Sequence, residues 1–201
     1  MGRPPAYELS AVVAAAGELF WERGYQMTSI SDLEERTGLD RSSLYHAFGS
    51  KQALFETALR CYVEENIRDR LAGMRQAGAG LAAVVSFFAG MARAFRADRA
   101  RASRGCLMVN TVAELGAHDA HAVLAAAAYR DRLREAFGTA LSRAAARGEV
   151  GTGRVQARAN LLASTTMGLF LTARIDPADA GAVCDSVAAE IRSWRRNKLD
   201  P

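Results

Sequence analysis

Apolar residues recur at helical spacing along almost the whole chain, and no segment shows the strict alternation typical of a strand. The first such segment runs from Tyr7 to Gly24, where apolar positions three and four residues apart fall on one face of an amphipathic helix. They are Leu9, Val12, Val13, Ala16, Leu19 and Phe20. Beyond residue 50 the same spacing predicts helices over residues 51–75, 81–96, 105–115, 119–147, 154–174 and 177–196. The pattern therefore predicts an all-α fold.

The breaks between these helices contain residues that commonly end or begin helices. Glycines lie in most of them, and Pro177 follows Asp176 at the start of the last helix. The polar, arginine-rich stretch 97–105 is also interpreted as a break. The short spacing of the first three helices predicts a small head over residues 1–52. Residues 53–201 then form a larger helical domain.

Residues 37–55 have the pattern of a sharp turn between two short helices. Gly38 supplies the positive φ that ends the first helix, and the Asp40 carboxylate can cap the N–H groups of the next. Leu39, Leu44 and Phe48 are expected to face a small core. The rest of this short helix consists of hydrogen-bonding residues, namely Arg41, Ser42, Ser43, Tyr45 and His46.

Those exposed side chains match the groups that duplex DNA presents. Arg41 can donate two hydrogen bonds to guanine, while the short Ser42 and Ser43 let a helix approach base edges. Tyr45, His46 and Lys51 suit phosphate oxygens. The alternative is an ordinary solvated helix face, which is the commoner meaning of such a pattern in isolation. The two preceding helices favour the DNA interpretation, because together the three form a compact helix-turn-helix head.

The second helix is expected to begin near Thr28 and Ser29. Asp32 lies three residues after Ser29, which is the spacing of a capping box. The positive end of this helix can also receive a phosphate.

Residues 7–55 resemble the DNA-binding head of the TetR family of transcriptional regulators. The matching residues are Phe20, Gly24, Thr28, Ser29, Ile30, Asp32, Gly38, Leu44, Tyr45, Phe48, Lys51, Leu54 and Phe55. The resemblance implies phosphate contacts by Thr28, Tyr45, His46 and Lys51, and base reading by Arg41, Ser42 and Ser43. It also implies a repressor that an effector releases from a palindromic operator. Glu34 departs from the family pattern, which usually has a small alanine where the second and third helices touch.

Composition fits such a regulator without proving it. Half of the 201 residues are hydrophobic, no apolar run is long enough to span a bilayer, and the N-terminus lacks a signal-peptide pattern, so we expect a cytoplasmic protein. The formal charge is +4, yet residues 1–52 contain five basic and seven acidic side chains. The net charge of the head therefore does not indicate nucleic-acid binding, whereas the positions of its basic side chains do. Arg3 in the GRPP arm is a candidate for the minor groove.

The last two predicted helices are candidates for a homodimer interface. The first has an apolar stripe at Val155, Ala159, Leu162, Ala163, Thr166, Met167 and Phe170, and the second at Val183, Val187, Ile191 and Trp194. Either stripe alone can equally be internal core. The TetR resemblance favours a four-helix bundle formed by two copies, which would match a two-fold operator.

An effector would need a cavity among the middle helices. Candidate lining residues are Phe87, Met91, Asn110, Tyr129, Met167 and Phe170. Ordinary core packing is the alternative for each of them. No glycine-rich phosphate loop or cofactor motif is present. We expect an unidentified small molecule and no cofactor.

The three cysteines, Cys61, Cys106 and Cys184, have neither CxxC nor zinc-ligand spacing. His118, Asp119 and His121 lie close together, but Asp119 as a helix cap explains them without a metal. Cys106 stands in RGCLMVN, which resembles a G-C-L-x-x-N segment found in some electrophile-responsive TetR-like regulators. If Ser103 caps this helix, the helix dipole and nearby arginines favour the Cys106 thiolate. A small buried hydrophobe is the alternative.

Two other classes of function remain. A thiol enzyme would pair Cys106 with His118 or His121, but no oxyanion nest or family signature accompanies them, so no catalytic residue is predicted. A helical interaction module that binds no DNA would fit the acidic head. The operator, the effector, the regulated genes, and the choice between repression and activation are not encoded in any recognisable pattern.

Overall fold

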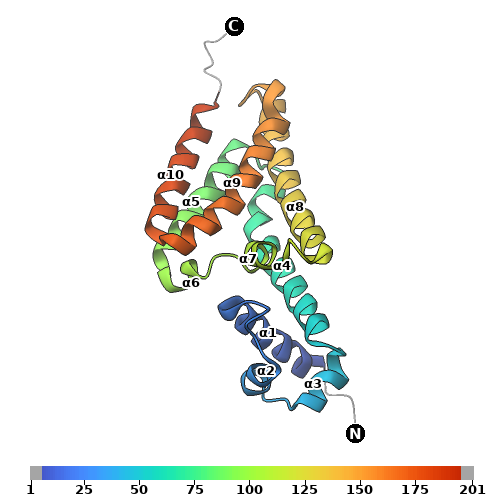
Figure 1. Ribbon diagram of the computed structural model, residues 1–201. Helices are drawn as coiled ribbons and strands as arrows, with labels where there is room; N and C mark the ends of the chain where they lie inside the picture. The colour runs from blue at the N-terminus through green and yellow to red at the C-terminus, as the bar shows by residue number, and fades with distance from the viewer. Residues whose placement is uncertain (1–5, 196–201) are drawn as a thin grey trace. The chain divides into compact units, whose positions relative to one another are not determined.

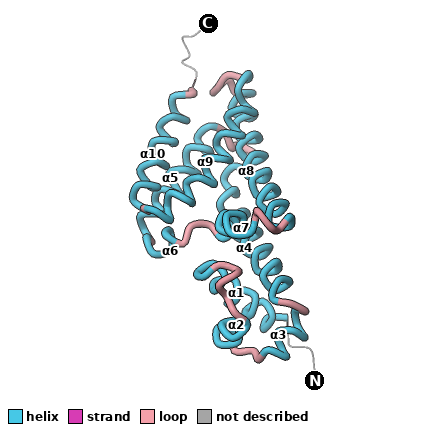
Figure 2. Tube along the Cα trace, viewed as in Figure 1, coloured by secondary structure: helices cyan, strands magenta, loops and turns pink. Residues whose placement is uncertain are grey.

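The computed structural model describes residues 6–195, and within them the chain consists of helices joined by short connections, without a strand (Figure 2). The all-α prediction is confirmed. None of the helices described has both the length and the apolar character needed to cross a membrane.

The helices follow the predicted order (Figure 1). They are α1 (Ala6–Arg23), α2 (Ile30–Thr37), α3 (Arg41–Phe48), α4 (Lys51–Arg75), α5 (Leu81–Ala97), α6 (Arg99–Ser103), α7 (Leu107–Leu115), α8 (Ala120–Ala146), the 3₁₀ turn η1 (Thr152–Arg154), α9 (Val155–Ile175) and α10 (Pro177–Ser193). Most ends lie within two residues of those predicted.

The structure differs from the prediction in the stretch 97–105. This segment was interpreted as a break, but Arg99–Ser103 forms α6, because the Asp98 carboxylate accepts a hydrogen bond from the Arg101 N–H at 2.8 Å and caps the turn. The following helix begins at Leu107 rather than at residue 105. Gly105 has a φ of 71°, a left-handed conformation that no α-helix contains.

The chain forms two compact units. One contains the described residues up to Asn66 together with Cys106–Val123, and the other contains residues 67–105 and those from Leu124 onward. Both α4 and α8 contribute residues to each unit. Helix α7 therefore belongs to the same compact unit as α1, α2 and α3, although it lies far along the sequence from residues 1–52.

Aromatic rings hold the first unit together. The Phe20 ring of α1 meets the Phe55 ring of α4 edge-on at 5.0 Å, and Tyr25 lies 4.8 Å from Phe55. Leu33 of α2 and Leu44 of α3 are buried as well. The apolar face of each short helix thus supplies the residues that attach it to the others.

The second unit has its own aromatic core. Phe137 of α8 packs edge-on against Phe87 at 5.2 Å and stacks on Phe88 at 5.7 Å. Within this unit α10 lies against α5 and α9 (Figure 1). Phe95 of α5 and Phe170 of α9 meet edge-on at 5.9 Å.

Candidate nucleic-acid interface

Helix α2 begins with a complete capping box. The Asp32 N–H donates to Ser29 Oγ at 3.1 Å, and the Ser29 N–H donates to Asp32 Oδ2 at 2.8 Å. The Ser29 hydroxyl also donates to Asp32 Oδ2 at 2.6 Å, and this bond together with the one from the Ser29 N–H holds the pKa of Asp32 below its usual value, with Arg23 assisting. The capping box predicted from the spacing of Ser29 and Asp32 is confirmed.

Helix α3 is held at its N-terminus by two carboxylates. Asp40 accepts the Ser43 N–H at 2.7 Å, and Glu34 of α2 accepts the Arg41 N–H at 2.7 Å. The bond from Ser43 lowers the pKa of Asp40. Glu34, the residue that departs from the TetR pattern, thus joins α2 directly to the first residue of α3.

The exposed side of α3 carries the predicted contact residues. Arg41, Ser42, Ser43 and His46 are exposed, and Tyr45 is 42% exposed. Leu44 points the other way and is buried. The structure therefore brings the base-reading and phosphate-contact candidates of this helix together on one accessible surface.

Lys51 stands at the start of α4. Its ammonium lies 4.3 Å from the centroid of the Tyr25 ring. Partial burial lowers the pKa of Lys51, while the negative charges of Glu114 and Asp32 oppose that shift. The side chain is thus restricted in position.

Thr28 differs from the other contact candidates. It is fully buried, and its hydroxyl donates to the Gly24 carbonyl oxygen at 2.6 Å. The hydroxyl therefore closes the turn between α1 and α2. The phosphate contact that the TetR resemblance implies for Thr28 stays a prediction. Arg3, the minor-groove candidate, lies outside the described residues.

Sequence reasoning missed Glu114 of α7. Its carboxylate accepts the Tyr25 N–H at 3.1 Å and the Gln26 N–H at 2.7 Å. The residues lie 88 and 89 positions apart, so no local spacing or motif could have indicated the contact. Only chain folding brings α7 to this turn.

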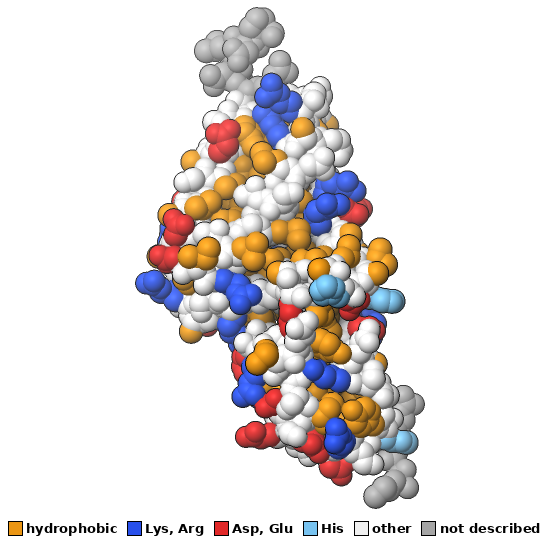
Figure 3. Space-filling model, in the orientation of Figure 1, with side chains coloured by type: hydrophobic (Ala, Val, Ile, Leu, Met, Phe, Trp, Pro, Cys, Tyr) orange, Lys and Arg blue, Asp and Glu red, His pale blue; other side chains and the backbone are white. Residues whose placement is uncertain are grey.

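The predicted stripe of α9 is mostly buried within one chain, whereas three of the four residues of the predicted α10 stripe, Val183, Val187 and Trp194, are at least partly exposed. Leu162, Thr166 and Phe170 of α9 and Ile191 of α10 are buried within one chain. The exposed apolar residues of these helices are Leu161, Leu171, Ile175 and Val183. Figure 3 shows hydrophobic side chains at the surface over α9 and α10, and charges of both signs on the head. The last two helices thus keep an apolar outer face, which on α9 is offset from the predicted stripe and on α10 includes Val183 of the predicted stripe.

Most of the predicted ligand residues are buried. Phe87, Met91, Tyr129 and Phe170 are buried, whereas Asn110 and Met167 are partly exposed. The Arg70 guanidinium lies 4.9 Å from the Phe170 ring centroid. Core packing therefore accounts for Phe87 and Phe170, each of which contacts another aromatic ring.

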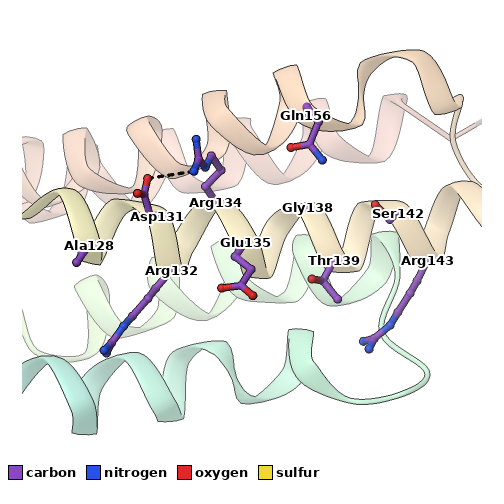
Figure 4. Close-up of a pocket in the computed structure, with 10 residues that line it drawn as sticks. All are labelled: Ala128, Asp131, Arg132, Arg134, Glu135, Gly138, Thr139, Ser142, Arg143 and Gln156. Carbon is purple, nitrogen blue, oxygen red and sulfur yellow. Dashed lines mark ion pairs between the residues drawn. The ribbon is translucent and has the colours of Figure 1, made fainter.

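A polar groove runs along the outside of α8 (Figure 4). Its charged side chains are Asp131, Arg132, Arg134, Glu135 and Arg143, and Gln156 of α9 completes the rim. Arg134 pairs with Asp131 at 3.4 Å. None of the predicted ligand residues lines this groove.

Cys106 is fully buried and is the N-cap residue of α7, directly before Leu107. Ser103 is the last residue of α6, and its hydroxyl donates to Ala100 at 2.9 Å. The expectation that Ser103 caps the helix of Cys106 is therefore wrong, because Gly105 turns the chain between them.

Asp119 accepts the His121 N–H at 2.8 Å, which confirms it as the cap of α8. No described group of three acidic, histidine or cysteine side chains is arranged to hold a metal ion.

Comparison with known proteins places these observations in one family. Residues 12–58 match the family described as bacterial regulatory proteins, tetR family. The HTH-type transcriptional repressor ComR of Escherichia coli is 33% identical over 120 residues, which are 57% of this chain and about half (54%) of ComR. YezE of Bacillus subtilis, an uncharacterized HTH-type transcriptional regulator, is 31% identical over 75% of this chain and 76% of its own.

Solved structures of other regulators superimpose on this chain over nearly its full length. The regulator CifR, as a cysteine mutant complexed with 26-bp double-strand operator DNA, superimposes with a TM-score of 0.77 at 26% identity, over 97% of this chain and 100% of CifR. A TetR transcriptional regulator from Chloroflexus aurantiacus has a TM-score of 0.78 at 27% identity, over 94% of this chain and 96% of its own.

Replacing Glu34 tests the junction between α2 and α3. Glu34→Ala removes the acceptor of the Arg41 N–H, and we expect the free energy of unfolding to fall by about 0.5 to 1.5 kcal/mol, with faster amide exchange at Arg41. Glu34→Gln keeps a carbonyl oxygen at this place and is the matched control. Urea unfolding and amide exchange measure the effect. Equal exchange at Arg41 in both variants would contradict the assignment.

Proposed function

Because the chain belongs to the TetR family of bacterial regulatory proteins, we propose that it is a homodimeric transcriptional repressor that binds a pseudo-palindromic operator in the cytoplasm. The exposed, hydrogen-bonding face of α3 carries this proposal. An eight-residue helix that is capped at its N-terminus and buries only Leu44 is well suited to enter a major groove. In this proposal residues 1–52 bind DNA, and residues 53–201 bind the effector and form the dimer.

The contacts divide by chemistry. Arg41, Ser42 and Ser43 face the base edges, where the Arg41 guanidinium recognises guanine O6 and N7. Tyr45, His46 and Lys51 contact phosphates and set the position of the helix on the duplex. The head needs this placement of its basic groups, because its total charge is not positive.

A second function is favoured by that same charge. A head with more acidic than basic residues fits a helical module that binds another protein rather than DNA. A gel shift with fragments of the source genome distinguishes the regulator from the interaction module, since the interaction module would shift none of the fragments. Catalysis has less support, because the relatives are named as transcriptional regulators.

The effector acts in residues 53–201 in this proposal. One candidate is a small molecule held near Met91, Asn110, Tyr129 and Met167, with Phe87 and Phe170 as neighbouring packing residues. The other is a reactive compound that modifies Cys106. CifR, whose solved structures with operator DNA are of cysteine mutants, supports testing the second candidate directly.

Replacing Arg41 tests base reading. Arg41→Ala should cost about 1 to 3 kcal/mol of operator binding and relax selection at one base pair, because the bidentate guanine contact is lost. Lys51→Ala should weaken all sequences alike and reduce the salt dependence. Arg75→Ala, which removes the same charge at the far end of α4, is the control. Selection from a random duplex library measures both effects, and an unchanged consensus in Arg41→Ala would refute base reading.

The dimer proposal uses the outer face of α9 and α10, which on α10 includes Val183 of the predicted stripe. Leu161, Leu171 and Ile175 are exposed at helical spacing, and Gly168 between them has open space around its Cα. Such a face allows close approach of a second copy.

Leu161→Glu should therefore dissociate the dimer, because the carboxylate would be buried without a partner. Since Leu161 is 59% exposed in one chain, the variant should still fold. Leu124→Glu, at a leucine of α8 that is 67% exposed, is the control. Sedimentation velocity reports the mass, and a folded Leu161→Glu dimer would place the interface elsewhere.

The cysteine hypothesis is tested with hypochlorite or a mild electrophile. If Cys106 is the switch, operator binding by the wild type should fall slowly, because the buried thiol reacts only when the structure opens locally. Cys106→Ser should be insensitive.

Two controls belong to this experiment. Burial raises the pKa of Cys184 to about 12, which makes that thiol a poor nucleophile, so Cys184→Ser should behave as wild type. Cys61 is the more accessible thiol, and Cys61→Ser reports whether modification there contributes. Loss of binding in Cys106→Ser, or in neither protein, would leave a non-covalent ligand as the effector.

A further inference from the structure

The turn between α1 and α2 forms a cradle for one carboxylate. Two consecutive backbone N–H groups, those of Tyr25 and Gln26, donate to the two oxygens of Glu114 at 3.1 and 2.7 Å. Hydrogen bonds to an ionised acceptor are stronger than neutral ones. Glu114 lies on α7, and all three residues belong to the same compact unit.

Gly24 completes the cradle. Its φ of 84° disfavours any residue with a side chain, and a Cβ at this position would lie 2.8 Å from Glu114 Oε2. The bare Cα therefore lets the carboxylate approach the backbone. The carbonyl of Gly24 also accepts the Thr28 hydroxyl, which connects the cradle to the start of α2.

The same turn restrains a predicted phosphate contact. Tyr25 donates its backbone N–H to Glu114, and its ring lies under the Lys51 ammonium. The negative charge of Glu114 favours the protonated form of Lys51 against the effect of burial. Glu114 thus acts on Lys51 through the position of the ring and through charge.

We propose that Glu114 is a positioning residue for DNA binding, which joins α7 to the α1–α2 turn and thereby places Lys51 and the start of α2 on the duplex. The proposal rests on the proposed function. The segment that carries Glu114 enters the head unit at Cys106 and leaves it at Val123, so this carboxylate ties the head to a part of the chain outside the helix-turn-helix.

The sign of the effect distinguishes positioning from simple electrostatics. Removing a negative charge from a DNA-binding unit should strengthen binding if the charge acts only by repelling phosphates. Glu114→Gln should instead weaken it by about tenfold, because an amide offers one acceptor oxygen for two N–H donors and leaves one of them unpaired. Glu64→Gln, at an exposed glutamate of α4 in the same unit, is the charge-matched control.

The experiment uses the full-length protein and a duplex selected by the wild type. Operator affinity is measured across a salt series for wild type, Glu114→Gln, Glu114→Asp and Glu64→Gln. Glu114→Asp keeps the charge but withdraws the carboxylate by one methylene, so it should weaken binding as well. If Glu114 acts through Lys51, Glu114→Gln should reduce the salt slope by about one phosphate contact, and it should not do so in a Lys51→Gln background.

Amide exchange at Tyr25 and Gln26 provides a readout that needs no DNA. Both amides should exchange faster in Glu114→Gln than in Glu64→Gln, while the helical content and the dimer persist. Equal or tighter operator binding by Glu114→Gln would overturn the proposal, as would unchanged exchange at both amides. A wild-type protein that binds no duplex would instead overturn the proposed function, and the exchange data would still test the cradle.

Discussion

The head depends on one constraint: the terminal backbone N–H and C=O groups of two eight-residue helices, α2 and α3, need hydrogen-bond partners. Helices of this length are marginal in water by themselves, and most of their backbone N–H and C=O groups lie in a terminal turn. Ser29 and Asp32 close the start of α2, while Asp40 and Glu34 close the start of α3. The exposed face of α3 can therefore consist of polar residues, because its stability does not rely on that face.

The same head shows how a surface rich in acidic residues is compatible with binding a polyanion. Asp32, Glu34 and Asp40 each accept backbone N–H groups, so their charges are directed at helix ends. Arg41 and Lys51 remain at the positions proposed to meet the duplex. Net charge is a poor guide when several of the acidic side chains have structural partners.

Burial shows why an apolar stripe on one helix does not by itself identify an interface. Leu162 and Phe170 have the spacing of an interface stripe, yet they fill the core of one chain. Leu161, Leu171 and Ile175 form the outward stripe on the same helix. An amphipathic pattern identifies which residues share a face, but the neighbouring helices decide which face is covered.

The sequence by itself determined most of the helices, the caps of α2, α3 and α8, and the α3 surface, because helical periodicity, capping residues and glycine turns are local properties. The residues Ser29, Gly38, Asp40 and Leu44 therefore lie where their types predict. Tertiary structure alone decided the burial of Thr28 and the contact of Glu114 with the α1–α2 turn. These depend on which distant segments pack together, and the Glu114 contact joins residues 88 and 89 positions apart, for which no local pattern exists.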